Sequence, residues 1–186
     1  MIEEKVENIS LTKQAWTRYL ARVIDIFLGT VIVLFILGVM FIAGSLIFKY
    51  STYYLEQATD LTFRIIEMIG MVIYFFIEAA IISKYGTTPA KKLFGISLSN
   101  ENGEKLDYKT ALGRGFTLWF RGLGLGLPII SFITLAVAYS NYTQDGQTTW
   151  DKDFNVVVSY KIISPIRFII GVTVFISIFV LFFLMH

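Results

Sequence analysis

The sequence predicts an all-α membrane protein with about four transmembrane helices, one of them broken into a hairpin at a Gly/Pro stretch, and with a small cytoplasmic β-hairpin. Its 186 residues are 55% hydrophobic and only 16% charged, with a mean hydropathy of +0.67, which is far more apolar than a soluble domain. Two or three apolar runs of about 20 residues match the roughly 30 Å hydrocarbon core of a bilayer. Basic residues gather in one loop, as expected for a cytoplasmic segment.

The first half of the chain predicts a polar arm followed by two spanning helices. Residues 1–15 are too polar for a cleavable signal peptide. The run 23–48 is apolar apart from Asp25 and a few small residues, and it predicts the first span. After a short interfacial loop at 49–60, the second span is expected over 61–83.

The segment 84–114 is polar and basic, so the positive-inside rule places it in the cytoplasm, together with the N-terminus. Within it, residues 96–99 alternate between apolar and polar side chains, and residues 100–103 (Asn-Glu-Asn-Gly) are a turn signal. These two features predict the small β-hairpin.

The stretch 107–141 has two interpretations, because a run of alternating glycine and leucine from Gly122 ends at Pro128. In the first, one span begins at this break and the loop 141–165 lies outside the cell. In the second, two shorter helices meet at the break and return the chain to the cytoplasm. We favour the second, because the basic residues between 152 and 167 then also lie inside.

The chain ends in an uninterrupted apolar run at 168–185, which predicts a last transmembrane helix. We therefore divide the chain into a polar arm (1–15), a membrane domain (16–160) and an additional C-terminal transmembrane helix (161–186). There is no cysteine, which excludes disulfides and thiolate chemistry. The sequence contains no pattern typical of a catalytic triad, a metal site or a phosphate-binding loop. We expect no enzymatic activity, no cofactor, no metal and no nucleic-acid partner.

Ionisable residues inside the apolar segments are the candidate functional residues, because each costs roughly 2.5–3.5 kcal/mol on insertion scales. In the first helix Arg18, Arg22 and Asp25 share one face. Asp25 is a candidate acceptor of a proton or a cation, held by Arg18. The alternative is a structural ion pair that fixes the rotation or the depth of the helix.

The second span places Glu67 and Glu78 on one face, and Glu78 at about the depth of Asp25. We expect the carboxylates of Asp25 and Glu78 to converge with an arginine from the later helix, either Arg114 or Arg121. A pair of buried carboxylates suits the exchange of a proton for a monovalent cation, because both compete for the same oxygens. A network of ion pairs that joins the helices explains the same residues equally well.

Three segments together resemble the RDD family of small bacterial membrane proteins, which is named for one arginine and two aspartates. Residues 18–25 (RYLARVID) are similar to the opening helix of the family, Arg-x-x-Ala-x-x-Ile-Asp. Residues 86–96 (GTTPAKKLFGI) are similar to its loop G-x-T-x-G-K-x-L-x-G-I, and residues 147–152 (QTTWDK) to its late Gln-Thr-x-x-Asp-Lys. This chain departs from the pattern at Ala90, in place of glycine, and at Trp150, where a histidine often stands.

The resemblance implies a multi-pass protein of the bacterial inner membrane. Family members are described as transporters, and sodium/proton antiport has been proposed for some. Carried over to this chain, the motif positions are Arg18, Asp25 and Asp151, and Arg114 matches a recurrent arginine. The resemblance also implies that a closing strand at 156–158 pairs with the strand at 96–99, which requires both loops on one side of the membrane.

The leading hypothesis is therefore an ion transporter that exchanges a monovalent cation for protons. Because so few spans enclose a pathway poorly, this hypothesis also predicts a homo-oligomer or a membrane-protein partner. The alternative is a non-catalytic membrane scaffold or assembly factor that binds a protein or lipid partner. In both cases the lipid bilayer surrounds the chain.

Overall fold

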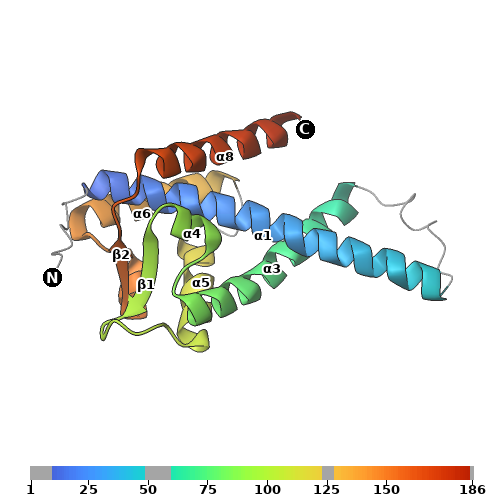
Figure 1. Cartoon of the computed structure of the whole chain (residues 1–186), viewed down its shortest axis with the longest axis horizontal. Coiled ribbons are helices and arrows are strands. Elements are labelled where there is room, and N and C mark those ends of the chain that lie inside the picture. The colour runs from blue at the N-terminus through green and yellow to red at the C-terminus, as the bar shows by residue number, and fades with distance from the viewer. Residues whose placement is uncertain (1–9, 49–59, 123–127, 185–186) are drawn as a thin grey trace.

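A computed structural model describes residues 10–48, 60–122 and 128–184. Two long helices, α1 (Leu11–Phe48) and α3 (Asp60–Tyr85), form its frame. The other elements pack around the first half of α1 and the last turns of α3, whereas the opposite ends of both helices extend away from them (Figure 1).

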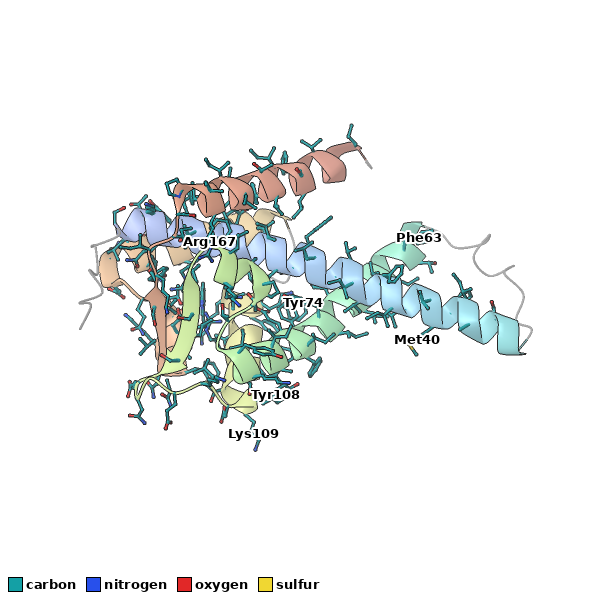
Figure 2. The ribbon with its side chains drawn as sticks, viewed as in Figure 1. Met40, Phe63, Tyr74, Tyr108, Lys109 and Arg167 are labelled. Atoms are coloured by element: carbon teal, nitrogen blue, oxygen red, sulfur yellow. The ribbon has the colours of Figure 1, made fainter. Side chains whose placement is uncertain are left out.

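Both long helices are long and apolar enough to cross a membrane, over Leu11–Ser45 and Leu61–Tyr85. At 1.5 Å per residue, α1 is about 57 Å long, nearly twice the hydrocarbon thickness. Its second half carries large exposed apolar side chains, including Phe35 (71% exposed) and Met40 (65%). Figure 2 shows Met40 and Phe63 on the extended ends of α1 and α3. These ends are the surfaces that lipid would cover.

Four spans were expected, and the described residues support two. The helix α8 (Pro165–Leu184) runs beside α1, and the continuous part of it whose side chains the structure describes, Pro165–Val180, is a shorter apolar helix. The stretch 107–141 forms two helices, α5 (Tyr108–Arg121) and α6 (Pro128–Asp145), as the broken-hairpin interpretation predicted. Residues 123–127 at the break lie outside the described part of the chain.

The sheet consists of two antiparallel strands, β1 (Ile96–Asn100) and β2 (Val156–Tyr160). This confirms the pairing that the family resemblance implied, and it corrects the local hairpin expected at 96–103. The turn at Gly103 brings Glu104 back to Asn100, whose backbone N–H donates to the Glu104 carbonyl at 2.9 Å, but residues 101–107 form no second strand. The chain instead continues to Asp107, whose side chain accepts a hydrogen bond from the backbone N–H of Thr110 (2.6 Å) and begins α5.

Two short helices, α4 (Pro89–Leu93) and α7 (Thr149–Asp153), have matching surroundings. Each is preceded by a glycine with positive φ and a threonine N-cap, and is followed by a phenylalanine, a second residue with positive φ and a strand. The corresponding residues are Gly86, Thr88, Phe94 and Gly95 for α4, and Gly146, Thr148, Phe154 and Asn155 for α7. Because Ile96 pairs with Tyr160 and Asn100 with Val156, a local two-fold rotation relates the two units.

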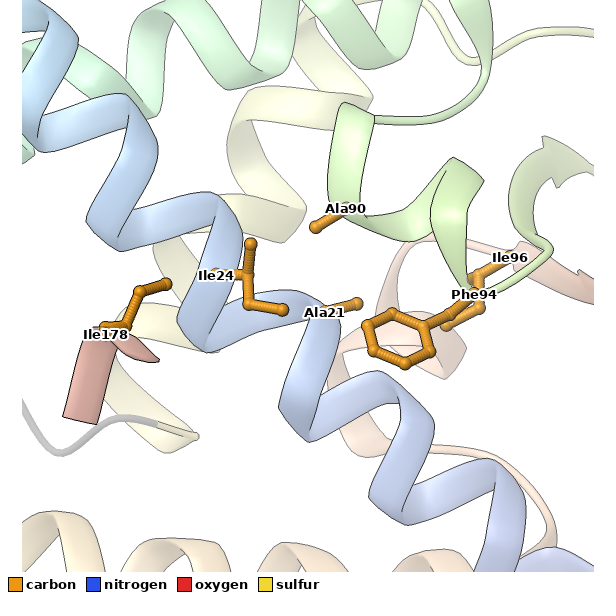
Figure 3. Close-up of a cluster of buried hydrophobic side chains, with 6 residues drawn as sticks. All are labelled: Ala21, Ile24, Ala90, Phe94, Ile96 and Ile178. Atoms are coloured by element: carbon orange, nitrogen blue, oxygen red, sulfur yellow. The ribbon is translucent and has the colours of Figure 1, made fainter. Parts of the chain in front are cut away.

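The apolar core holds α4 and β1 against α1 and α8. Figure 3 shows one cluster, to which four elements contribute Ala21, Ile24, Ala90, Phe94, Ile96 and Ile178. The ring of Phe94 lies so close to Gly171 of α8 that a Cβ there would collide with it. Likewise, α1 and α3 cross at Gly29, where the Tyr74 ring leaves no room for a Cβ. These close contacts set the position of the end of α4 relative to α8, and of α1 relative to α3.

The strand register is testable because the chain has no native cysteine. Ser97 and Ser159 are directly opposite each other in the sheet. We expect the double variant Ser97→Cys, Ser159→Cys to form an intramolecular disulfide under mild oxidation, since opposite residues lie within about 4.4–6.8 Å between Cα atoms. The measurement is the mobility shift of the membrane-inserted protein on non-reducing gels. Equal or faster cross-linking of the offset pair Ser97→Cys, Val157→Cys would show that the register is different.

Candidate functional site

A cluster of buried polar side chains lies where α1 meets α3 and α4. The helix α1 contributes Arg22 and Asp25 from adjacent turns, and α3 contributes Glu78. The short helix α4 contributes Lys91, and Thr88 is its N-cap. All five side chains belong to buried residues. Charged groups are buried only when they are paired, so their contacts define the site.

The ammonium group of Lys91 lies at the centre of the cluster. Its Nζ atom is 3.1 Å from Oδ2 of Asp25, 2.9 Å from Oε1 of Glu78 and 3.2 Å from Oγ1 of Thr88. We call these three oxygen-bearing side chains the Lys91 cradle. Asp25 also accepts hydrogen bonds from the Thr88 hydroxyl and from the backbone N–H of Ala90. The first turn of α4 therefore binds Asp25 through both backbone and side chains.

Arg22 completes this cluster from the other side of Glu78. Its Nη1 atom is 2.5 Å from both carboxylate oxygens of Glu78, and its guanidinium carbon lies 5.4 Å from the centre of the Phe75 ring. The Nε and Nη2 groups of Arg22 are buried and have no hydrogen-bond partner among the described residues. The guanidinium thus uses only one of its three nitrogens for pairing.

A second cluster surrounds Asp151 of α7, which is 0% exposed. Arg114 of α5 donates from Nε to Oδ1 at 2.7 Å, Arg18 of α1 pairs with Oδ2, and the Thr148 hydroxyl donates to Oδ2 at 2.6 Å. Burial by itself raises the pKa of Asp151, but the guanidinium groups of Arg114 and Arg18 and the hydrogen bonds lower it to about 2. Asp151 is therefore a charged carboxylate that connects α1, α5 and α7.

The structure places the predicted site residues in two groups rather than one. Asp25 and Glu78 lie together, bridged by Lys91. Arg18, expected to hold Asp25, instead pairs with Asp151, because the first turns of α1 face α7 and those around Asp25 face α4. The side chain of Glu67 lies outside the described part of the structure.

The two arginines proposed from the later helix have different environments. Arg114 is buried against Asp151, whereas Arg121 forms a 2.5 Å pair with Asp153 at the surface. Lys91 was not among the candidate site residues, because it lies in a loop whose charge is explained by topology alone. The one signal that singled it out was its place in the family-like segment 86–96.

Two long helices with exposed apolar faces, joined at one end by buried ion pairs, define a helical membrane protein of small size. The chain belongs to the RDD family, whose model it matches over residues 12–155. It is 30% identical over 131 residues to the uncharacterized protein YxaI of Bacillus subtilis strain 168, covering 65% of this chain and 83% of that protein. No solved structure matches the chain. The motif residues Arg18 and Asp151, far apart in sequence, contact each other directly.

Replacing Asp151 tests how strongly this cluster stabilises the fold. In Asp151→Asn, the buried Arg114 and the partly buried Arg18 lose their carboxylate, so we expect a loss of about 3–5 kcal/mol of stability. The matched control is Asp153→Asn in the same helix, whose pair with Arg121 is exposed and should contribute less than about 1 kcal/mol. The measurement is the melting temperature of the purified protein in detergent. Equal melting temperatures for the two variants would show that the Asp151 cluster is not stabilising.

The same carboxylate predicts a pH dependence. The pKa of Asp151 is about 2 in the folded chain and about 3.9 in an unfolded one. Its stabilising contribution is therefore complete above about pH 5 and is lost as the pH falls through 4 toward 2. We expect wild type to lose about 2 kcal/mol more than Asp151→Asn over that range, at 1.36 kcal/mol per pKa unit. Melting curves of both proteins between pH 7 and pH 2.5 measure this difference in stability. Equal losses of stability in the two proteins would contradict the prediction.

Proposed function

We propose that this protein exchanges a monovalent cation for protons across the bacterial inner membrane, with its N-terminus in the cytoplasm, and that the Lys91 cradle is the exchange site. The observation that carries the proposal is the ammonium group of Lys91 bound between two carboxylates and a hydroxyl, at 2.9–3.2 Å from their oxygens. A monovalent metal cation takes the same kind of oxygen ligands. Ionisable groups retained beside a membrane-spanning segment commonly mark ion and proton paths.

The charges of the cluster suggest how exchange would be coupled. Asp25 and Glu78 are balanced by Arg22 and by the ammonium of Lys91. When Lys91 releases its proton, the two carboxylates of the cradle are balanced only by the guanidinium of Arg22. The cradle then attracts one cation. Entry of that cation restores neutrality, and reprotonation of Lys91 expels it. A lysine suits this role because, unlike arginine, it can lose its proton.

The two-fold relation between the units around α4 and α7 supports the same proposal. Many transporter folds are built from internal repeats, with the binding site near the interface of the repeats. Lys91 lies next to this interface, since α4 leads directly into β1. Two candidate spans enclose no pathway, so transport also requires a homo-oligomer or a membrane-protein partner.

A scaffold or assembly factor that binds a protein or lipid partner is the second candidate. It is favoured by one observation, which is that Asp25, Glu78 and Asp151 all have basic partners within the chain. In that case the clusters only hold the helices together. Lys91 is buried and would not reach a partner, so a scaffold would use exposed basic residues such as Lys92.

Replacing Lys91 by arginine separates the charge of this residue from its ability to exchange a proton. We expect Lys91→Arg to insert and fold but to lose cation-driven proton flux at least about tenfold. A loss of about 1.4 kcal/mol in the affinity for the cation is enough to give that factor. Asp25→Asn should lose flux as well. The matched control Lys92→Arg changes an exposed neighbour and should keep the flux. The measurement is sodium- or potassium-driven pH change inside proteoliposomes at equal protein content.

Two results would count against exchange at the cradle. Wild-type flux in Lys91→Arg would remove Lys91 as the proton carrier. Absence of flux in correctly inserted wild type would favour the scaffold, which predicts that neutralising Lys92 impairs partner binding while Asp25→Asn does not.

A further inference from the structure

A cavity of about 420 Å³ lies next to both ion-pair clusters, and most of its wall lies outside the Lys91 cradle. Its wall is formed by the first turns of α1, by α5, α6 and α7, and by the sheet. The volume is in the usual range of ligand pockets, roughly 300–1,000 Å³. Most of the wall is apolar, with side chains such as Val23, Leu135 and Val158. A hydrocarbon group therefore matches most of its surface.

The polar part of this wall is cationic. Four basic side chains reach it, namely Arg18, Arg22, Lys91 and Arg114. Their carboxylate partners are three, Asp25, Glu78 and Asp151, so the two clusters together carry one more positive than negative charge. An uncompensated cation in an apolar surrounding favours the binding of an anion.

Two wall residues also have hydrogen-bond donors without acceptors. Arg22 and Trp150 are each 7% exposed, and both line the cavity. The Nε and Nη2 groups of Arg22 and the Nε1 group of Trp150 have no partner among the described residues. Guanidinium and indole N–H groups can only donate, so their complement must be an acceptor. These donor atoms are buried in this structure, so an acceptor in the cavity would reach them only after the two side chains turn toward it.

We propose that this cavity binds one acidic lipid, with its phosphate accepting from Arg22 and Trp150 and its hydrocarbon lying on the apolar wall. An oxygen-rich anion alone would satisfy the donors and leave the apolar surface in contact with water. A neutral lipid would cover that surface and leave the excess positive charge. Only a molecule with both parts matches the whole wall.

The position of the cavity agrees with this ligand. Trp16 of α1 and Tyr139 of α6 line the cavity and are also exposed on the outside, at 56% and 43%. These two side chains therefore lie at the solvent-exposed edge of the cavity. Tryptophan and tyrosine are the side chains enriched at the level of lipid headgroups. A lipid would enter with its chain toward the exposed apolar length of α1.

The test is a lipid titration of the purified chain in detergent, read by native mass spectrometry. The ligands are phosphatidic acid, phosphatidylcholine with the same chains, and inorganic phosphate. Trp150→Phe keeps an aromatic side chain and removes the donor, and Ala138→Phe fills the apolar wall without changing a charge. Ala43→Phe adds the same bulk on the exposed second half of α1 and is the matched control.

We expect phosphatidic acid to bind at least about tenfold more tightly than phosphatidylcholine. Both cavity variants should lose about that factor, while Ala43→Phe should not. Equal binding of the two lipids, or binding unchanged in Trp150→Phe, would overturn the site. Phosphate that binds as tightly as phosphatidic acid, with no effect of Ala138→Phe, would overturn the lipid and leave a free-anion site. The readout is binding, so it is independent of whether the protein transports ions.

Discussion

The burial of charge at one end of two apolar helices constrains the rest of this structure. Arg22, Asp25 and Glu78 lie on helices that are otherwise suited to hydrocarbon, where an unpaired ion is costly. Arg22 pairs with Glu78, Lys91 of α4 pairs with both Asp25 and Glu78, and Asp151 of α7 pairs with Arg18. The short helices are therefore required to neutralise these charges. The small sheet follows from this requirement, because β1 and β2 continue directly from α4 and α7.

The features that could be predicted from the sequence are those with a local cause. Apolar length identified the two long helices, and Gly122 to Pro128 marked the break between α5 and α6. The approach of Asp25 to Glu78 was predicted from helical spacing and depth. What could not be predicted is the choice among basic partners. From the sequence, either Arg18 or Lys91 could pair with a nearby carboxylate. Only the packing of α4 and α7 against α1 shows that Arg18 pairs with Asp151 and Lys91 with Asp25.

The local hairpin was wrong for a related reason. Residues 96–103 contain an alternating strand and a turn, but the residues after the turn do not alternate, and Asp107 begins a helix. The true partner, β2, supplies the fully buried Val156, which packs with Leu98 and Ala79. A strand of five residues gains little from a polar neighbour, so the distant apolar strand prevails.

The two-fold relation between the α4 and α7 units has a consequence for how charge is distributed over the molecule. Lys91 and Asp151 are both the third residue of their short helices, and each is the centre of its cluster. One is a cation between two carboxylates and the other a carboxylate between two guanidinium groups. The two halves are thus alike in backbone and opposite in sign. Because the two centres carry opposite charges, α1 meets them with opposite charges of its own, Asp25 toward one half and Arg18 toward the other.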